Sequence, residues 1–233
     1  MSEAAQHSKV ALVTGGSRGL GRALTAELAA HGWLVVIDGR DATRLIATAS
    51  ELGAAVTAVV GDVADPVHRA DLVRTAAGLG ALTLVINNAG SLGPSPLPVL
   101  ADVALPAVRQ VFEANVLAPL ALVQDVIGTL RRNGGTIVNV TSDAAVEGYE
   151  GWGPYGLTKA ALESVTRVLA AEEPLVRVMA VDPGDLRTEM HQEAFPGEDI
   201  SDRPLPESVA PAIVELIESV ARSGRYRAPE LVR

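Results

Sequence analysis

Cysteine is absent from this chain of 233 residues, and histidine is rare. Without cysteine there is no disulfide, no thiolate nucleophile and no cysteine-bound metal. The four histidines are well separated in the sequence, which does not favour a zinc site. We therefore expect no metal site in this protein.

Basic residues are outnumbered, with 19 lysines and arginines against 28 aspartates and glutamates and a formal net charge of −9. Nucleic-acid binding needs a basic surface, so no nucleic-acid partner is expected. No run of 18 apolar residues occurs, and residues 1–8 are polar rather than signal-like. We expect a cytoplasmic protein with no membrane span and a flexible start at 1–8.

Aromatic residues make up only 3% of the chain, whereas 48% of it is apolar. An apolar fraction rich in alanine, valine and leucine, with 22 glycines, suits helices packed closely on a sheet. The length fits a single domain, 1–233.

Short apolar runs alternate with segments of helical periodicity. Strands are expected at 10–13, 34–37, 56–60, 82–86, 137–140, 176–181 and, briefly, 226–228. Helices are expected at about 20–31, 44–52, 66–77, 101–130, 155–172 and 208–221, with 185–206 irregular. Such alternation predicts a doubly wound parallel α/β sheet with helices on both faces.

A glycine-rich loop, Thr14-Gly-Gly-Ser-Arg-Gly-Leu-Gly21, follows the first predicted strand and leads into a helix. At this junction glycines let a pyrophosphate approach the backbone, and the helix N-terminus favours an anion. Glycines also make ordinary tight turns, so the loop alone is a weak signal. Its place in the first strand-to-helix turn strengthens the prediction of a nucleotide site.

Lysine occurs only at Lys9 and Lys159, and Tyr155 lies four residues before Lys159. On a helix the two side chains share one face. A nearby ammonium stabilises a phenolate, so we expect a lowered Tyr155 pKa and a proton donor and acceptor near neutral pH. A chance pairing is the alternative, and support has to come from other motifs.

Further motifs follow the fourth and fifth predicted strands. Asn87-Asn88-Ala89-Gly90 ends the fourth, and Ser142 ends the fifth, thirteen positions before Tyr155. With the glycine loop and the Tyr155/Lys159 pair, the chain resembles the short-chain dehydrogenase/reductase family from Lys9 to about Thr188. The resemblance implies a Rossmann-type sheet, strand order 3-2-1-4-5-6-7, that binds a nicotinamide cofactor.

The resemblance also implies four catalytic roles. Ser142 hydrogen-bonds the substrate carbonyl oxygen, and Tyr155 protonates it or deprotonates the alcohol in reverse. Lys159 holds the nicotinamide ribose and lowers the tyrosine pKa, and Asn115 orders a water that completes a proton relay. Taken alone, three of these residues also have a structural explanation. Ser142 could cap a turn, Asn115 could be a helix residue that faces solvent, and Tyr155 could lie at the start of a helix and pack on a loop. Thr141 is the neighbour most easily mistaken for the catalytic hydroxyl.

The choice of cofactor depends on Asp38-Gly39-Arg40, at the end of the second predicted strand. A carboxylate at the discriminating position binds the ribose 2′-hydroxyl and rejects a 2′-phosphate. The family register places that position at Gly39, and Arg40 and Arg18 then meet the phosphate. NADP(H) is therefore preferred over NAD(H). If Asp38 is the discriminator instead, both arginines are solvated and NAD(H) is preferred.

The resemblance implies further cofactor contacts along the chain. The full set is Gly15, Ser17, Arg18, Gly19, Leu20, Gly21, Arg40, Asp62, Val63, Asn88, Ala89, Gly90, Tyr155, Lys159, Pro183, Gly184, Leu186 and Thr188. The substrate region is expected at 91–98, 144–152 and within 185–206, with Leu92, Tyr149, Trp152, Met190 and Phe195 as candidate walls.

The resemblance favours an NADP(H)-dependent carbonyl reductase acting on a small carbonyl or alcohol substrate. Extended relatives that are epimerases or dehydratases carry an added substrate domain, for which too few residues follow Thr188. A regulator that binds NAD(P)H without turnover is the alternative, although such proteins usually lose the tyrosine or the lysine. The glycine-rich tail common in the family is absent, so a homodimer is expected rather than a tetramer.

Overall fold

The computed structural model describes residues 9–232 and contains a parallel sheet of seven strands. The strand order is β3-β2-β1-β4-β5-β6-β7, which confirms the predicted topology. The strands are β1 Lys9–Val13, β2 Leu34–Gly39, β3 Val56–Val60, β4 Ala81–Asn87, β5 Thr136–Val140, β6 Arg177–Asp182 and β7 Gly224–Arg227. The expected flexible start, 1–8, lies outside the described residues.

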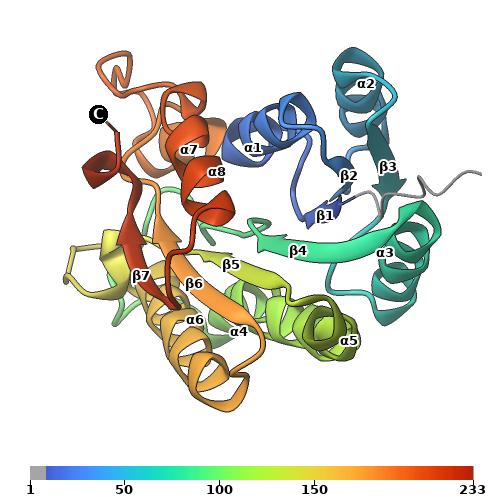
Figure 1. Ribbon diagram of the computed structural model, residues 1–233. Coiled ribbons are helices and arrows are strands. Elements are labelled where there is room, and N and C mark those ends of the chain that lie inside the picture. The colour runs from blue at the N-terminus through green and yellow to red at the C-terminus, as the bar shows by residue number, and fades with distance from the viewer. Residues whose placement is uncertain (1–8, 233) are drawn as a thin grey trace, which may run out of the picture.

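Helices cover both faces of the sheet (Figure 1). They are α1 Gly19–Ala30, α2 Ala42–Leu52, α3 Pro66–Leu79, α4 Leu105–Phe112, α5 Ala118–Asn133, α6 Gly153–Glu172, α7 Glu189–Ala194 and α8 Ala210–Glu218. Alternate strand residues face opposite sides, so Ala11 and Val13 join the core under α1, α2 and α8. Val10 and Leu12 join the core under α3 and α5. Both faces of the sheet are covered by helices, so most residues of the inner strands are buried and apolar.

One long helical stretch covers the predicted region 101–130, but it is not a regular helix. A π-helical turn, Glu113–Leu117, separates α4 from α5. Pro119 lies in the first turn of α5 and has no N–H, so it cannot donate to the Asn115 carbonyl as an α-helix requires. The irregular turn thus contains the predicted site residue Asn115, whose main-chain carbonyl lacks its usual α-helical donor.

The same stretch, Leu105–Asn133, is the one helix in the described part of the chain that is long and apolar enough to cross a membrane. Core helices of soluble folds pass that test too, and 44% of its most apolar window is buried in this fold. Leu122, Val126 and Leu130 are fully buried in the core beneath the sheet. The apolar character is thus used in packing.

Two C-terminal features differ from the sequence prediction. The region 185–206 is not wholly irregular, because Thr188 caps the short helix α7 by accepting a hydrogen bond from the His191 amide at 3.1 Å. The brief strand expected at 226–228 begins two residues earlier, as β7, and pairs in parallel with β6. Both differences place extra side chains near the carboxyl edge of the sheet.

Candidate active site

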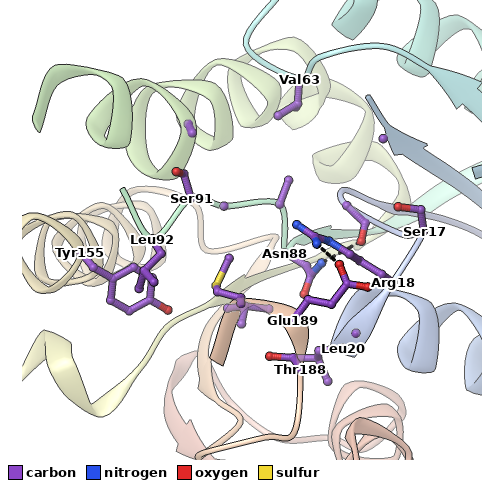
Figure 2. Close-up of a pocket in the computed structure, with 18 of the residues that line it drawn as sticks. Ser17, Arg18, Leu20, Val63, Asn88, Ser91, Leu92, Tyr155, Thr188 and Glu189 are labelled. Atoms are coloured by element: carbon purple, nitrogen blue, oxygen red, sulfur yellow. Dashed lines mark hydrogen bonds and ion pairs between the residues drawn. The ribbon is translucent and has the colours of Figure 1, made fainter. Parts of the chain in front are cut away.

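A cleft of about 840 Å³ opens where the strands end. Loops after β1, β2, β3, β4, β5 and β6 all contribute to its lining. Ligands bind at this edge in open parallel sheets. Figure 2 shows Tyr155 and Leu92 towards one end of the cleft and Ser17 and Arg18 towards the other.

The glycine loop between β1 and α1 leaves space for a ligand close to the backbone. Gly15 has φ +67°, in the left-handed region that side chains disfavour. A Cβ on Gly21 would lie 2.3 Å from the Gly15 carbonyl oxygen, so only glycine lets α1 pack this tightly. Gly21 is therefore beneath the cleft rather than in its lining, and supports the loop from behind.

Asp38 is buried and serves the loop itself. Its Oδ1 accepts a hydrogen bond from the Gly15 amide at 2.7 Å, and its Oδ2 lies 3.3 Å from Nε2 of His68 on α3. Only 2% of the residue is exposed. Asp38 also lines the cleft, and each of its carboxylate oxygens already makes one contact within the protein.

Asn88 and Thr14 join the ends of β1 and β4. The Thr14 hydroxyl accepts hydrogen bonds from the amides of Asn88 and Ala89, both at 3.0 Å. The Asn88 side-chain amide donates to the carbonyls of Thr14 at 2.9 Å and Gly15 at 3.2 Å. Asn88 lines the cleft as predicted, but its side-chain N–H groups hold the glycine loop.

Tyr155 and Lys159 lie one turn apart on α6, and both line the cleft. Lys159 is only 4% exposed. Its Nζ donates to the Val140 carbonyl at 2.7 Å and lies 5.3 Å from the centre of the Tyr155 ring. Burial lowers the pKa of Lys159 to about 8.

The expected lowering of the Tyr155 pKa is not found. Burial raises that pKa, and the carboxylates of Asp182 and Asp143 raise it further. The Ser142 hydroxyl opposes the shift. Lys159 lies beside the ring, and its Nζ donates a hydrogen bond to the Val140 carbonyl. With its pKa raised, the Tyr155 phenol keeps its proton at neutral pH.

Ser142 and Thr141 both line the cleft but differ in their hydrogen bonds. Ser142 lines the cleft next to Tyr155, and it also caps the short 3₁₀ turn Asp143–Ala145, accepting from the Ala144 amide at 3.2 Å. The Thr141 hydroxyl is buried and donates to Glu163 Oε1 at 2.8 Å. Ser142 therefore caps the turn, as one interpretation predicted, and it also lies where a catalytic hydroxyl is expected. The Thr141 hydroxyl is already bonded to Glu163.

Asn115 lies behind the cleft and is 1% exposed, so a solvent-facing side chain is wrong. Its side-chain amide donates to the Ser91 carbonyl and the Thr158 hydroxyl, both at 2.9 Å. Its Oδ1 accepts from the Ser91 amide at 2.7 Å. These bonds tie the π-helical turn to the loop after β4 and to α6.

Two arginines converge at the other end of the cleft, but not the predicted pair. Arg18 and Arg44 both bind the carboxylate of Glu189, the first residue of α7, and Arg44 Nη1 lies 2.8 and 2.9 Å from its two oxygens (Figure 2 shows the Arg18 contact). Arg40 lines the cleft with a side chain that is 78% exposed, 4.0 Å from Asp62. The two guanidiniums lower the pKa of Glu189, Arg44 most.

Most predicted site residues meet in this cleft. Those that line it are Gly15, Ser17, Arg18, Gly19, Leu20, Arg40, Asp62, Val63, Asn88, Ala89, Gly90, Ser142, Tyr155, Lys159, Pro183, Gly184, Leu186 and Thr188. Of the candidate substrate walls, Leu92, Trp152 and Met190 line it, and Phe195 packs on Trp152 with ring centres 6.0 Å apart. Tyr149 points instead to Asp143, donating at 2.9 Å.

Three contributions were missed by the sequence analysis. Arg44 and Glu189 are 145 positions apart in the chain, and no local pattern pairs them. Arg225, on β7, donates a hydrogen bond to the Ser142 carbonyl. In the sequence, the C-terminal tail stands out only because it lacks the glycine-rich segment common in the family. Glu189 could have been suspected only from its position directly after Thr188, a predicted cofactor contact.

Comparison with known proteins gives consistent matches. The family model described as short chain dehydrogenase matches residues 9–199. Sepiapterin reductase of Meriones unguiculatus is 36% identical over 203 residues, 79% of this chain and 77% of its own. An alcohol dehydrogenase of Thermococcus sibiricus, complexed with 5-hydroxy-NADP, has a TM-score of 0.85 at 26% identity, covering 94% of this chain and 95% of that one.

A second solved structure carries the other cofactor. The 3-ketoacyl-(acyl-carrier-protein) reductase of Brucella melitensis, complexed with NADH, has a TM-score of 0.86 at 27% identity. It covers 95% of this chain and 96% of that one. These similar structures therefore do not decide between the two nicotinamide cofactors.

Proposed function

The chain belongs to the short-chain dehydrogenase/reductase family of oxidoreductases, and from that premise we propose that it is an NADP(H)-dependent reductase of carbonyl substrates. Its relatives are named reductases and dehydrogenases, so its chemistry acts on CH–OH and C=O groups. The observation that carries the proposal is the meeting of Ser142, Tyr155 and Lys159 in one cleft with the glycine loop.

The cleft fits a dinucleotide. A Cβ on Gly15 would lie only 3.0 Å from the Ala89 Cα, so a side chain is disfavoured at this position of the loop. The N-terminus of α1 follows the loop and would face a bound phosphate. Gly15, Ser17, Gly19 and Leu20 would hold the pyrophosphate. The loop from Pro183 to Thr188 would hold the carboxamide. When bound, the nicotinamide supplies or accepts the hydride.

The adenosine end supports NADP(H). Arg18 and Arg44 already share a carboxylate, so two guanidiniums converge on one anion as a 2′-phosphate requires. Arg40 lines the same end, and Gly39 rather than a carboxylate faces Ser17 there. Asp38 lines the cleft as well, but its carboxylate already contacts Gly15 and His68, which supports Gly39 rather than Asp38 as the discriminating position.

The chain's own groups perform the acid–base part of the reaction. Tyr155 keeps its proton at neutral pH and donates it to the substrate oxygen during reduction. Ser142, at the same end of the cleft, hydrogen-bonds that oxygen. Lys159, almost fully buried, would bind the ribose hydroxyls and place its charge near the phenol. The Asn115 side chain holds the π-helical turn against Ser91 and Thr158. Its main-chain carbonyl, to which Pro119 cannot donate, would bind the relay water.

The proposal is tested by NADPH oxidation across a panel of ketones and aldehydes. Turnover of at least one carbonyl, with NADPH bound far more tightly than NADH in calorimetry, is expected. Tight NADPH binding with no turnover on any of them would favour a sensor instead. Equal affinities for the two cofactors would contradict the NADP(H) assignment.

A homodimer through α4, α5 and α6 is part of the proposal. Leu105, Leu117, Leu157 and Val168 lie on this stretch and are 66%, 49%, 47% and 50% exposed, which is unusual for a surface that stays in water. Light scattering is expected to give twice the chain mass, and a monomer at micromolar concentration would contradict it. A cytoplasmic location stays a prediction.

A further inference from the structure

Strand β7 presents two arginines towards the catalytic helix. Arg225 and Arg227 alternate with Tyr226, so they point to one face while Tyr226 packs in the core on the other. β7 pairs with β6 so that Arg225 is beside Ala180 and Arg227 beside Asp182. The tail therefore delivers positive charge to the back of the active site.

Arg225 joins three elements of that site with one guanidinium. Its Nε donates to Glu163 Oε1 on α6 at 2.8 Å. Its Nη2 donates to Asp182 Oδ2 at the end of β6 at 3.0 Å, and to the Ser142 carbonyl at 3.3 Å. A planar fork with fixed donors suits this arrangement, whereas a single ammonium does not.

The two carboxylates depend on this partner. Glu163 and Asp182 have side chains only 5% and 3% exposed. Each has one further arginine, at longer range: Arg167 is 3.8 Å from Glu163, and Arg227 is 3.6 Å from Asp182. Buried carboxylates need close compensating charge, and Arg225 supplies the closest to both.

Both carboxylates lead to groups in the cleft. Asp182 Oδ1 accepts from the Gly184 amide at 3.0 Å and so fixes the loop that borders the cofactor. Glu163 accepts from Thr141, next to Ser142. Asp182 also raises the pKa of Tyr155, as does Asp143 from the turn after β5, while Lys159 lies on the phenol's own helix.

We propose that Arg225 is a positioning residue for the reaction, holding Ser142 and the Pro183–Gly184 loop in place and neutralising Asp182 near Tyr155. The inference rests on the proposed roles of Ser142 and Tyr155. Arg225 is not part of the cleft lining, so it would act through the Ser142 backbone and the Asp182 carboxylate rather than by contact with substrate or cofactor.

The test compares Arg225→Lys and Arg225→Met with Arg222→Met, an exposed arginine for which the described residues form no ion pair. Both Arg225 variants are expected to lose about 10- to 100-fold in kcat, as small misplacements do. The Kd for the cofactor is expected to rise much less, by about two- to fivefold, because only the carboxamide contacts of the 183–188 loop are loosened. Arg222→Met is expected to match the wild type.

The pH profile separates positioning from charge. In alcohol oxidation, Arg225→Met leaves Asp182 less neutralised, so the rise of kcat with pH is expected to move up by about one pH unit. Arg225→Lys keeps the charge and is expected to keep the wild-type profile while losing kcat. A residue that only stabilised the fold would lower the active fraction and leave the profile of both variants unchanged.

Hydrogen exchange gives a readout that needs neither turnover nor a stable Arg225→Met protein. In Arg225→Lys, amides of segment 183–188 are expected to exchange faster, with those of α1 unchanged. Wild-type kcat and wild-type exchange in Arg225→Lys would overturn the inference. Tyr155→Phe, run in parallel, separates the two claims: if it keeps full turnover, the proposed site has failed, whatever Arg225 does.

Discussion

The two ends of the cleft are built differently. At the catalytic end, Lys159 and Asn115 are almost fully buried, and each polar atom has a protein partner within 2.9 Å. At the adenosine end, Arg18, Arg44 and Glu189 have side chains about half exposed and pair with one another. Buried networks fix geometry, whereas exposed ion pairs exchange partners easily.

The difference suggests a division of labour. Under the proposed function, the buried end holds the groups whose positions decide the rate, and the exposed end offers cations that could bind the 2′-phosphate in place of Glu189. Variants at the first end should therefore change kcat or stability, and variants at the second end should change cofactor affinity.

Tyr155→Phe removes the only phenol in the cleft lining of the described residues. Loss of a general acid typically costs about 10²- to 10⁴-fold, so kcat for ketone reduction should fall by that factor. The Kd for NADPH, measured by calorimetry, should stay within about twofold because the ring remains. Retained kcat would refute the assigned role, and Tyr149→Phe, outside the cleft lining, is the matched control.

Lys159→Met should change how the stability of the cofactor-free protein depends on pH. The folded pKa of about 8 lies below the unfolded value of about 10.4, so between these values the unfolded state binds more protons. Wild-type stability should rise across that window by up to roughly 3 kcal/mol relative to the variant. Urea unfolding of both proteins at pH 7 and pH 10 measures this difference. The same change in unfolding free energy between the two pH values in wild type and variant would contradict the prediction.

Arg44→Met should weaken NADPH binding about tenfold and leave NADH binding unchanged, because only the 2′-phosphate loses a charge-assisted hydrogen bond. Calorimetry with both cofactors measures the selectivity. Arg74→Met, an exposed arginine on α3 paired with Asp71, is the control. Equal losses for NADPH and NADH would show that Arg44 does not read the phosphate.

Glu189→Gln should change the affinity for NADPH least, and should raise it rather than lower it. Its carboxylate competes with the phosphate for Arg18 and Arg44, and exposed ion pairs are weak, so NADPH should bind about two- to fivefold more tightly. NADH should be unaffected. The gain should shrink as ionic strength rises. Weaker NADPH binding in this variant would mean that Glu189 orders the arginines for the phosphate rather than competing with it.

Local patterns in the sequence were enough to predict the sheet and the catalytic end. The strands are nearly continuous apolar runs because both faces are covered, and the Tyr155/Lys159 pair follows from its spacing on one helix. The choice of Ser142 and Asn115 follows from the resemblance to the family. The order of the strands follows from the resemblance. These features depend on neighbours in the chain or on the family pattern.

Features that depend on distant side chains were not predictable. The direction of Asp38 is set by His68 on another element, and the arginine partner of Glu189 by a contact across the cleft. The raised pKa of Tyr155 comes from burial and from Asp182, which the Tyr155/Lys159 spacing does not reveal. The role suggested for Arg225 likewise needs the register of β7 against β6.

The division of labour is tested most directly by the rate of oxidation of bound NADPH in a single turnover, at saturating cofactor and ketone. Tyr155→Phe should be at least about 100-fold slower than the wild type, whereas Arg44→Met should match it once the cofactor is saturating. A wild-type rate in Tyr155→Phe, or an equal loss in both variants, would contradict the account.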